Sequence, residues 1–330
     1  MKKYSKKISV IITAYNRKNF LYDAVKSAID QTIDKKLYEI IIIKNFEDKK
    51  INKLIEKSKD IKIKQILLKS KLIYYQGGML ISKALKKADG EVICFLEDDD
   101  IFEKNKLQQI LKVFENNKNV VCYNNNKLII DKNGKKIKNE NEKNLEPFIL
   151  YLHNINHKLI KKFNFNVSSI SIHSNIINLS YLRQVPLGMD IFLFYLSLIN
   201  GEIYIDNKKL TRYRVHNLNM NEYFKKFSNL KNMNNKYNTG SWLIYKMIRE
   251  QNNRELLRYI GYQFALPDAL SYDIRSKINK LEYIKHAKIL WIATLKRETA
   301  FNKFILFSFV PLISMKFANK IQDFYENIDA

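Results

Sequence analysis

The sequence has few residues of the kinds that build disulfide or metal frameworks. Its 330 residues include two cysteines, Cys94 and Cys122, and five histidines. Both cysteines lie in apolar stretches without metal-ligand spacing, so we expect them to be small buried residues. The absence of a disulfide framework is typical of a reducing compartment, and the basic N-terminus shows no signal-peptide cleavage pattern. The sequence therefore predicts a cytoplasmic protein.

Acidic residues are also scarce relative to basic ones. There are 33 aspartates and glutamates against 58 lysines and arginines, which gives a net charge of +25. This balance suits nucleic acid, an anionic membrane surface or a phosphate-rich substrate as a partner. Lysine, asparagine and isoleucine are abundant along the whole chain, however, so the charge alone selects no partner.

Apolar runs long enough to cross a membrane are missing. Residues 165–178 lack Asp, Glu, Lys and Arg, but they are rich in Ser and Asn, which makes membrane insertion unfavourable. The charge-free stretch Phe304–Met315 would reach only about 18 Å as a helix, short of the ~30 Å hydrocarbon core. It fits a helix lying on the inner face of the cell membrane and a helix packed in a core equally well.

Short apolar runs alternate with helical patterns in the first part of the chain. This alternation, in a chain that is 46% apolar, predicts an α/β fold with a mainly parallel sheet and helices on both of its faces. The expected strands cover residues 8–12, 39–43, 61–67, 92–96, 120–123 and a strand pair at 203–215. The expected helices cover residues 19–31, 51–57, 79–88, 107–115 and 191–199. Residues 124–146 are polar, and we expect an exposed hairpin or loop there.

Four carboxylates follow the apolar run at residues 92–96 directly. Glu97, Asp98, Asp99 and Asp100 must lie at the carboxyl end of that strand, where open α/β sheets bind ligands. Adjacent negative charges repel one another, and a hard cation such as Mg²⁺ or Mn²⁺ would relieve the repulsion. A solvated turn that caps a helix starting near Phe102 explains the same residues equally well.

Two stretches together resemble a known family. The segment Ile8-Ser9-Val10-Ile11-Ile12-Thr13-Ala14-Tyr15-Asn16-Arg17 is similar to the opening of glycosyltransferase family 2, and residues 84–100 resemble that family's helix, strand and acidic motif. The resemblance covers about residues 8–220. It implies a GT-A fold, which is a Rossmann-like mixed sheet, over residues 1–225, and an α-helical C-terminal region at 226–330.

The resemblance also implies roles for individual residues. Asp99 would bind Mn²⁺ or Mg²⁺, with Asp100 as the alternative ligand, and Glu97 would contact the ribose. His216, in the setting Tyr213-Arg214-Val215-His216, would complete the metal shell. The nucleotide-sugar donor would also be contacted by Thr13, Ala14, Tyr15, Arg17, Asn45, Asp98 and Arg214.

Asp190 resembles the family's catalytic base at the start of a buried helix. It would take the proton of an attacking hydroxyl group, which implies transfer with inversion at the anomeric carbon. Met189 stands where the family's first acid of this pair usually lies, and the position of Asp190 would also suit a helix N-cap.

A second departure from the family follows the strand at 39–43. The family usually has paired aspartates there, whereas this chain has Lys44 and Asn45. Asn45 can still donate to and accept from a base edge, but Lys44 can only donate. Guanosine or another base is therefore as compatible with the sequence as uridine.

The expected function is glycosyl transfer from a nucleotide sugar to a glycan or a lipid-linked glycan. A sugar-phosphate nucleotidyltransferase is the alternative enzyme, but it needs a glycine-rich loop after its first strand, and residues 13–17 contain no glycine. A basic nucleic-acid-binding protein is the alternative outside enzymes, although no such motif occurs. An inactive transferase would also explain Lys44 and Met189.

Overall fold

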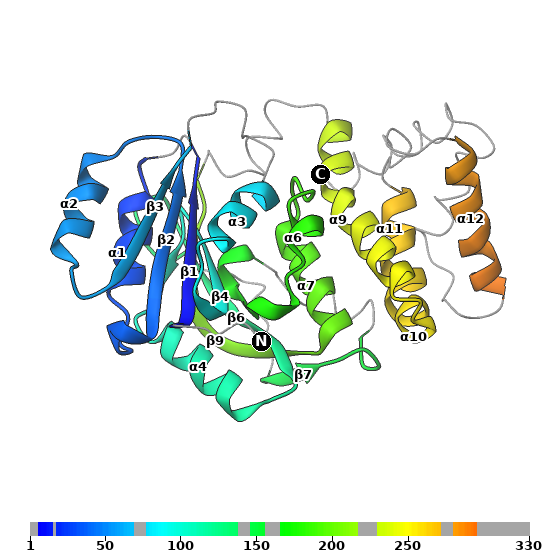
Figure 1. The fold of residues 1–330 in the computed structure, drawn as a ribbon, viewed down its shortest axis with the longest axis horizontal. Helices are drawn as coiled ribbons and strands as arrows, with labels where there is room; N and C mark the ends of the chain where they lie inside the picture. Colours follow the sequence, from blue (N-terminus) through cyan, green and yellow to red (C-terminus); the bar gives the residue numbers. More distant parts are fainter. Residues whose placement is uncertain are drawn as a thin grey trace. The chain divides into compact units, whose positions relative to one another are not determined.

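A computed structural model describes residues 6–15, 18–68, 77–137, 146–155, 166–216, 230–271 and 280–295. The chain divides into two compact units, Met1–Phe227 and Ser228–Ala330. Figure 1 shows the elements of both units along the chain.

Four parallel strands form one half of the sheet in the first unit. Their order is β3-β2-β1-β4, with β1 at Lys6–Ala14, β2 at Tyr38–Lys44, β3 at Lys62–Leu67 and β4 at Gly90–Glu97. The register places Thr13 opposite both Ile43 and Glu97, so the carboxyl ends of β1, β2 and β4 meet at one edge. The strands at 8–12, 39–43 and 92–96 are confirmed, because continuous apolar runs are what a strand buried on both faces requires.

The other half of the sheet is mixed in direction. From β4 the order continues β8-β6-β9-β5, and β7 pairs with β9. The strand β8 is antiparallel to both β4 and β6, and β6 is parallel to β9. The bounds are β5 Ile101–Phe102, β6 Val120–Ile130, β7 Phe148–Leu150, β8 Ile170–His173 and β9 Glu202–Arg214.

Two expectations about this half are wrong. Residues 124–130 belong to the second part of β6, and the expected hairpin is found only at the end of that strand, where Ile130 bridges Lys136 in antiparallel. Residues 203–215 form one long strand rather than a pair. Asn124 and Asn125 are buried in β6, and the Asn125 amide donates to Thr211 Oγ1 of β9 at 3.0 Å. A strand whose asparagine side chains are paired inside a sheet has the same amino-acid composition as a polar loop. The polar composition of these residues therefore led to a wrong prediction.

Helices cover both faces of the sheet. The helices α1 (Leu21–Ile29), α2 (Lys49–Lys57) and α4 (Lys106–Asn116) share one hydrophobic cluster with Ile8, Val10 and Ile12 of β1. The helix α3 (Gly77–Leu85) contacts β1 and β2, while α7 (Met189–Asn200) contacts β6, β8 and β9, and both lie across the sheet from α1 in Figure 1. A short helix, α6 (Leu179–Leu182), contacts α3. The helix expected to start near Phe102 begins only at Lys106, because residues 101–102 form β5.

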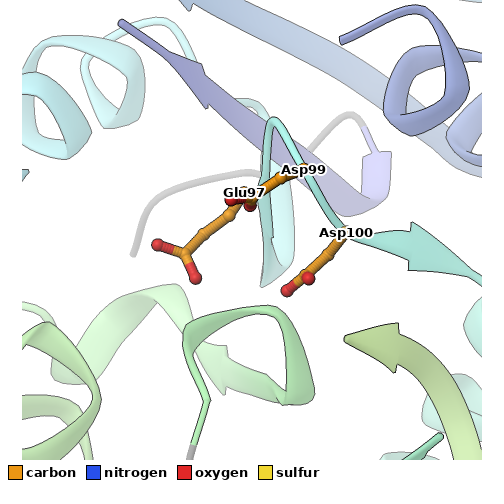
Figure 2. Close-up of side chains that lie close together, drawn as sticks. All are labelled: Glu97, Asp99 and Asp100. Atoms are coloured by element: carbon orange, nitrogen blue, oxygen red, sulfur yellow. The ribbon is translucent and has the colours of Figure 1, made fainter. Parts of the chain in front are cut away.

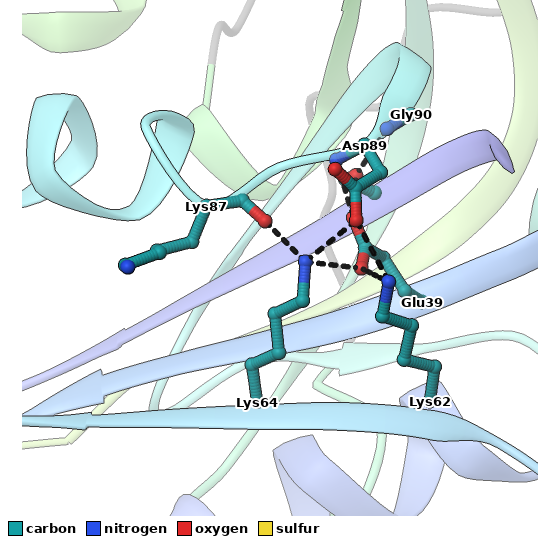
Figure 3. Close-up of polar contacts among 7 residues, drawn as sticks. Glu39, Lys62, Lys64, Lys87, Asp89 and Gly90 are labelled. Atoms are coloured by element: carbon teal, nitrogen blue, oxygen red, sulfur yellow. Dashed lines mark hydrogen bonds and ion pairs between the residues drawn. The ribbon is translucent and has the colours of Figure 1, made fainter. Parts of the chain in front are cut away.

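The amino ends of β1, β2 and β4 are joined by a buried carboxylate, Glu39 (Figure 3). Its Oε1 accepts from Ser9 Oγ at 2.7 Å and from the Asp89 N–H at 2.6 Å, and Ser9 Oγ accepts from the Gly90 N–H at 2.8 Å. Its Oε2 pairs with Lys64 Nζ at 2.9 Å. Any side chain at Gly90 would collide with β1, since a Cβ there would lie 2.3 Å from the Ser9 nitrogen. This edge therefore fixes the strand register.

The second unit is helical wherever it is described. It contains α9 (Leu230–Glu250), α10 (Arg254–Leu256), a π-helical segment (Leu257–Ala265), α11 (Leu266–Ser271) and α12 (Lys280–Leu295). Pro267 lies in the first turn of α11, directly after the π-helical segment. At the end of that segment the Leu266 N–H donates to the carbonyl oxygen of Gly261, five residues earlier. The chain therefore remains helical on both sides of Pro267. Among the described residues, no helix combines the length and apolarity that a membrane span needs.

Glu39 offers a test of how the strand register is stabilised. Glu39→Ala would remove the acceptor for Ser9 Oγ and the Asp89 N–H as well as the partner of Lys64, and we expect it to lower the free energy of unfolding by about 2–4 kcal/mol. Urea denaturation of the full chain measures this change. Glu115 is exposed on α4, so Glu115→Ala is the control and should stay within about 0.5 kcal/mol of the parent. Equal losses in the two variants would show that Glu39 has no special role.

Candidate active site

Three carboxylates gather at the carboxyl end of β4. Glu97 is the last residue of β4, a turn at residues 98–99 follows, and Asp100 precedes β5. One oxygen from each of Glu97, Asp99 and Asp100 lies within 4.8 Å of the others. Figure 2 shows the three side chains projecting from this one loop. The cluster includes both Asp99 and Asp100, the expected metal ligand and its alternative.

The cluster concentrates negative charge where water is scarce. Asp99 and Asp100 are buried, with exposed fractions of 5% and 1%, and Asp98 is buried beside them but does not belong to the cluster. Burial, followed by the charge of Asp99, raises the pKa of Asp100 to about 7. Carboxylate oxygens at this spacing are the donor set that Mn²⁺ and Mg²⁺ prefer. The residues present therefore fit a divalent cation.

A second layer of polar groups holds the acidic loop. Asn166 donates from Nδ2 to Asp100 Oδ2 at 3.2 Å and to Glu97 Oε2 at 3.4 Å, and Ser168 Oγ accepts from the Glu97 N–H at 3.0 Å. Sequence reasoning missed both residues. The sequence feature that could have identified them is the Ser- and Asn-rich stretch at 165–178, because buried amides and hydroxyls in a charge-free segment need hydrogen-bond partners.

Arg214, at the end of β9, clamps the same loop. Its backbone N–H donates to Asp100 Oδ1 at 3.0 Å, and its Nε donates to the Asp99 carbonyl oxygen at 2.9 Å. The other guanidinium nitrogens bond to the Lys132 oxygen at 2.9 Å and to Asp23 Oδ2 at 3.0 Å. The sequence predicted a phosphate contact for Arg214. That role stays a prediction, whereas its contacts in the structure hold the loop in place.

His216 reaches the cluster through Asp99. Its Nε2 lies 3.0 Å from Asp99 Oδ2, and its ring packs against Phe20 with 4.7 Å between ring centroids. The Arg214 guanidinium lies 4.7 Å from the centroid of the same Phe20 ring. Phe20 therefore packs against both of these side chains. Metal ligation by His216 stays a prediction.

A buried lysine behind the loop was also missed. Lys106 lies in the first turn of α4, is fully buried, and donates from Nζ to the Ser168 oxygen at 2.5 Å and to Thr211 Oγ1 at 2.8 Å. Burial lowers its pKa to about 7, although Asp100 acts in the opposite direction. A lysine at the start of an amphipathic helix normally belongs to its solvated face, so the sequence gave no reason to place this one inside.

The expected donor-binding residues lie beside the cluster. Thr13 and Ala14 end β1, which lies between β2 and β4, with Ala14 opposite Lys44 and Thr13 opposite Glu97. Tyr15 and Asn45 follow β1 and β2 directly and are half-buried. Arg17 lies outside the described residues. The structure thus brings most of the expected donor contacts to one edge of the sheet, and their individual roles stay predictions.

Asp190 lies in the first turn of α7. The N-cap of that helix is Gly188, in a left-handed conformation with φ 68°, so the alternative that Asp190 is the N-cap is wrong. Its Oδ1 accepts from the Ile191 N–H at 3.0 Å, and burial raises its pKa. The charges of Asp190, Glu97 and Asp100 all act on Lys127 of β6, whose Nζ lies 4.4 Å from the centroid of the Tyr213 ring. Asp190 therefore faces the same region as the acidic cluster.

The acidic cluster lies at the carboxyl ends of the parallel strands, which is where open α/β sheets bind their ligands. The family model described as "Glycosyl transferase family 2" matches residues 9–184, and the chain belongs to that family. Crystal structures of TarS from S. aureus share the fold. The complex of TarS residues 1–349 with UDP-GlcNAc has a TM-score of 0.57 and 16% identity over 88% of this chain and 80% of that one. The expected GT-A architecture and C-terminal helices are thereby confirmed.

Curated relatives match over shorter regions. An uncharacterized glycosyltransferase of Nostoc is 36% identical over 40% of this chain and 39% of its own length. An Escherichia coli protein named UDP-Glc:alpha-D-GlcNAc-diphosphoundecaprenol beta-1,3-glucosyltransferase WfaP is 35% identical over 36% of this chain and 45% of its own length. A Rickettsia bellii glycosyltransferase is 33% identical over 41% of this chain and 19% of its own length. The matched region thus spans less than half of each of these three relatives.

The burial of Asp100, together with the charge of Asp99 beside it, should affect the stability of the folded protein in a pH-dependent way. Because the pKa of Asp100 in the folded protein, about 7, lies above its ordinary value of 3.8, the folded state holds the Asp100 proton more tightly than the unfolded state. The contribution of Asp100 to stability therefore falls as pH rises from about 4 through 7. Asp100→Asn, with chelator present, should raise the Tm at pH 8 and change it little at pH 5. A lower Tm at pH 8 would contradict this account of the cluster.

Proposed function

We propose that this protein is a metal-dependent, inverting glycosyltransferase that moves a sugar from a nucleoside-diphosphate sugar to a hydroxyl group. The observation that carries the proposal is the buried cluster of Glu97, Asp99 and Asp100 at the sheet edge that also bears Thr13–Tyr15. Membership of glycosyltransferase family 2 supports it over a nucleotidyltransferase or a nucleic-acid-binding protein.

Each part of the site has a chemical task in this reaction. Glu97, Asp99 and Asp100 would hold Mn²⁺ or Mg²⁺, which neutralises the charge that grows on a diphosphate leaving group. Arg214 and Asn166 keep the acidic loop in one conformation while the donor binds. Asp190 takes the proton from the acceptor hydroxyl, and its raised pKa makes it a better proton acceptor than an exposed aspartate.

The experiment compares two variants with the parent chain. Full-length protein is incubated with Mn²⁺ and a panel of nucleoside-diphosphate sugars, and release of the nucleoside diphosphate is followed. Asp99→Asn should abolish turnover and weaken Mn²⁺ binding. Asp190→Asn should lower turnover by roughly 10²–10⁴-fold while the donor Kd stays near the parent value, because a general base acts on the acceptor and not on the donor.

Glu115→Gln, on the exposed face of α4, is the matched control and should leave turnover unchanged. Retention of the anomeric configuration in the product, observed by NMR, would contradict Asp190 as the base. Release of pyrophosphate from a nucleoside triphosphate and a sugar phosphate would instead identify a nucleotidyltransferase.

We further propose that the helical unit places the enzyme on an anionic membrane surface. The helix α12 packs inward through buried residues including Tyr283, Ala287 and Leu290. A second set of apolar residues on the same helix is exposed and forms a stripe along it. With 3.6 residues per helical turn, the exposed Lys288 lies within this stripe. We call this the outer stripe of α12, and it consists of Leu281, Ile284, Trp291, Ile292 and Leu295.

A membrane is the occupant that the composition of the outer stripe favours. Trp291 and the aliphatic residues suit the boundary between headgroups and acyl chains, and Lys288 suits anionic lipids in a chain of net charge +25. The name of the E. coli relative includes a diphosphoundecaprenol acceptor, which is lipid-linked. A lipid-linked glycan is therefore our proposed acceptor. The stretch Phe304–Met315, expected to contribute, lies outside the described residues.

Flotation with liposomes tests the membrane proposal. The full chain should float with vesicles containing phosphatidylglycerol at low salt, and a variant with Trp291→Ser and Leu295→Ser should float much less, because the outer stripe loses its apolar contact. Leu37→Ser is the control, since Leu37 is also exposed but lies in the first unit. Equal flotation of all three proteins, or none of the parent, would remove the case for the outer stripe. A concentration-dependent dimer lost in the double variant would identify a second copy as the occupant instead.

A further inference from the structure

Lys127 of β6 brings a basic side chain to the region of the candidate active site. It is half-buried, and its Nζ lies over the Tyr213 ring of β9, 4.4 Å from the ring centroid. The negative face of an aromatic ring attracts a cation above it, so this contact holds the ammonium group in one place. Neither residue has a role in the proposed mechanism so far.

The strand register brings Lys127 and Tyr213 to the same face of the sheet. The strands β6 and β9 are parallel, and their register shifts on both sides of Asn126. After these shifts Lys127 is opposite Thr211, and Ile129 is opposite Tyr213. Because side chains two residues apart point to one face of a strand, Lys127 and Tyr213 share a face. Irregularities of this kind redirect side chains and are frequent beside active sites.

Carboxylates from two separate elements act on this ammonium group. Burial lowers the pKa of Lys127, and the charges of Asp100, Asp190 and Glu97 act in the opposite direction. Asp100 and Glu97 belong to the acidic cluster, whereas Asp190 belongs to the first turn of α7, which contacts β6 and β9. Burial raises the pKa of Tyr213, and the charges of the cluster and of Asp190 raise it further. Lys127 and Tyr213 are therefore within electrostatic reach of both the cluster and Asp190.

Burial and charge act on Asp190 in opposite directions. Burial raises the pKa of Asp190, whereas the backbone N–H groups of Ile191 and of Asp190 itself lower it, and the charge of Lys127 lowers it as well. Among the described residues, Lys127 is the charged side chain that has this effect. Removal of the Lys127 charge would therefore leave the effect of burial less opposed.

The other titratable groups on the elements packed against α7 do not replace Lys127. These elements are β6, β8, β9 and the 3₁₀ turn Ser174–Ile176, which contains no titratable residue. The contacts of the histidine of β8 and of the arginines of β9 join them to other elements, and they are His173 with Phe114, Arg212 with Glu103 and Arg214 with Asp23. The remaining titratable residues of β6 and β9 that do not act on the pKa of Asp190 are Tyr123, Glu202, Tyr204, Asp206, Lys208 and Lys209.

We propose that Lys127 is a positioning residue whose ammonium group, held over the Tyr213 ring, is the counter-charge that keeps Asp190 a carboxylate until the acceptor binds. This inference rests on the proposed function and adds a residue to the surroundings of the base. In the reaction the acceptor O–H proton passes to an Asp190 oxygen while the acceptor oxygen bonds to the anomeric carbon. The bond from that carbon to the diphosphate oxygen breaks. Only an ionised Asp190 can take the proton.

The same ammonium group has an opposite effect on the acidic cluster. A cation near Glu97 and Asp100 repels a divalent ion that binds to them. Lys127 therefore supports the base while it weakens metal binding. A side chain that only stabilised the local fold would support both.

NMR of the full chain with isotope-labelled aspartate carboxyl groups measures the ionisation of Asp190 directly. Its resonance is the one that is missing from Asp190→Asn, and the titration needs neither metal nor donor. Lys127→Met should raise the midpoint by about one pH unit, at the low end of what a nearby opposite charge produces. Lys127→Arg keeps the charge and should stay near the parent. Lys112→Met, exposed on α4, is the matched control and should leave the midpoint unchanged.

Two further measurements separate an electrostatic role from a structural one. In the pH profile of kcat, the acidic limb of Lys127→Met should move to higher pH by the same amount. The turnover of this variant should approach that of the parent about two pH units above the midpoint. By calorimetry, Lys127→Met should bind Mn²⁺ roughly threefold to tenfold more tightly, because a repelling charge is gone.

The outcomes separate this inference from the proposed function. An unchanged Asp190 midpoint in Lys127→Met, or weaker Mn²⁺ binding, would overturn the role of Lys127 and leave the proposed transfer reaction standing. Weaker binding of the nucleotide sugar with an unchanged midpoint would identify Lys127 as a phosphate contact and would overturn it too. A raised midpoint in Lys127→Met, with no turnover of any donor by the parent, would contradict the proposed function and still support the pairing of Lys127 with Asp190.

Discussion

Mutual repulsion among buried carboxylates is the constraint on which the arrangement of this site depends. Asp99 and Asp100 are adjacent in the chain, both are buried, and both point into a region that also contains Glu97. The surrounding protein holds them through the backbone N–H and side chain of Arg214, the amide of Asn166 and the ring of His216. These contacts fix the geometry and leave the negative charge to attract a cation.

The buried charges differ between the amino and carboxyl edges of the sheet. At the amino edge, Glu39 is buried but fully engaged with Ser9, Asp89 and Lys64, so it joins three strands at little electrostatic cost. At the carboxyl edge, charges of one sign gather at the acidic cluster, and the buried Nζ of Lys44 has no hydrogen-bond partner among the described residues. The register fixed by the first edge determines which residues face one another at the second.

The strand ends and the acidic loop could be predicted from the sequence because both depend on local patterns. A continuous apolar run predicts a buried strand, and acids after it must lie at its end. Asn166, Ser168 and Lys106 could not be predicted, because their partners lie far along the chain. The same reason explains the error at residues 124–130. Their polar side chains predict a loop, because the sequence does not show that Thr211 of β9, some eighty residues later, is a hydrogen-bond partner. Asp190 was placed at the right helix, but its relation to the helix cap depended on the backbone of Gly188.

The position of Arg214 in the chain has a consequence for how the protein is made. The acidic loop is complete by residue 100, but the residue that clamps it belongs to the last strand of the sheet, more than a hundred positions later. On the ribosome, the three carboxylates therefore emerge long before Arg214 and His216 do. During that interval the nascent chain carries the acids without their clamp, and a premature metal ion would meet a loop that has no fixed geometry. The fixed geometry of the acidic loop therefore depends on the synthesis of β9.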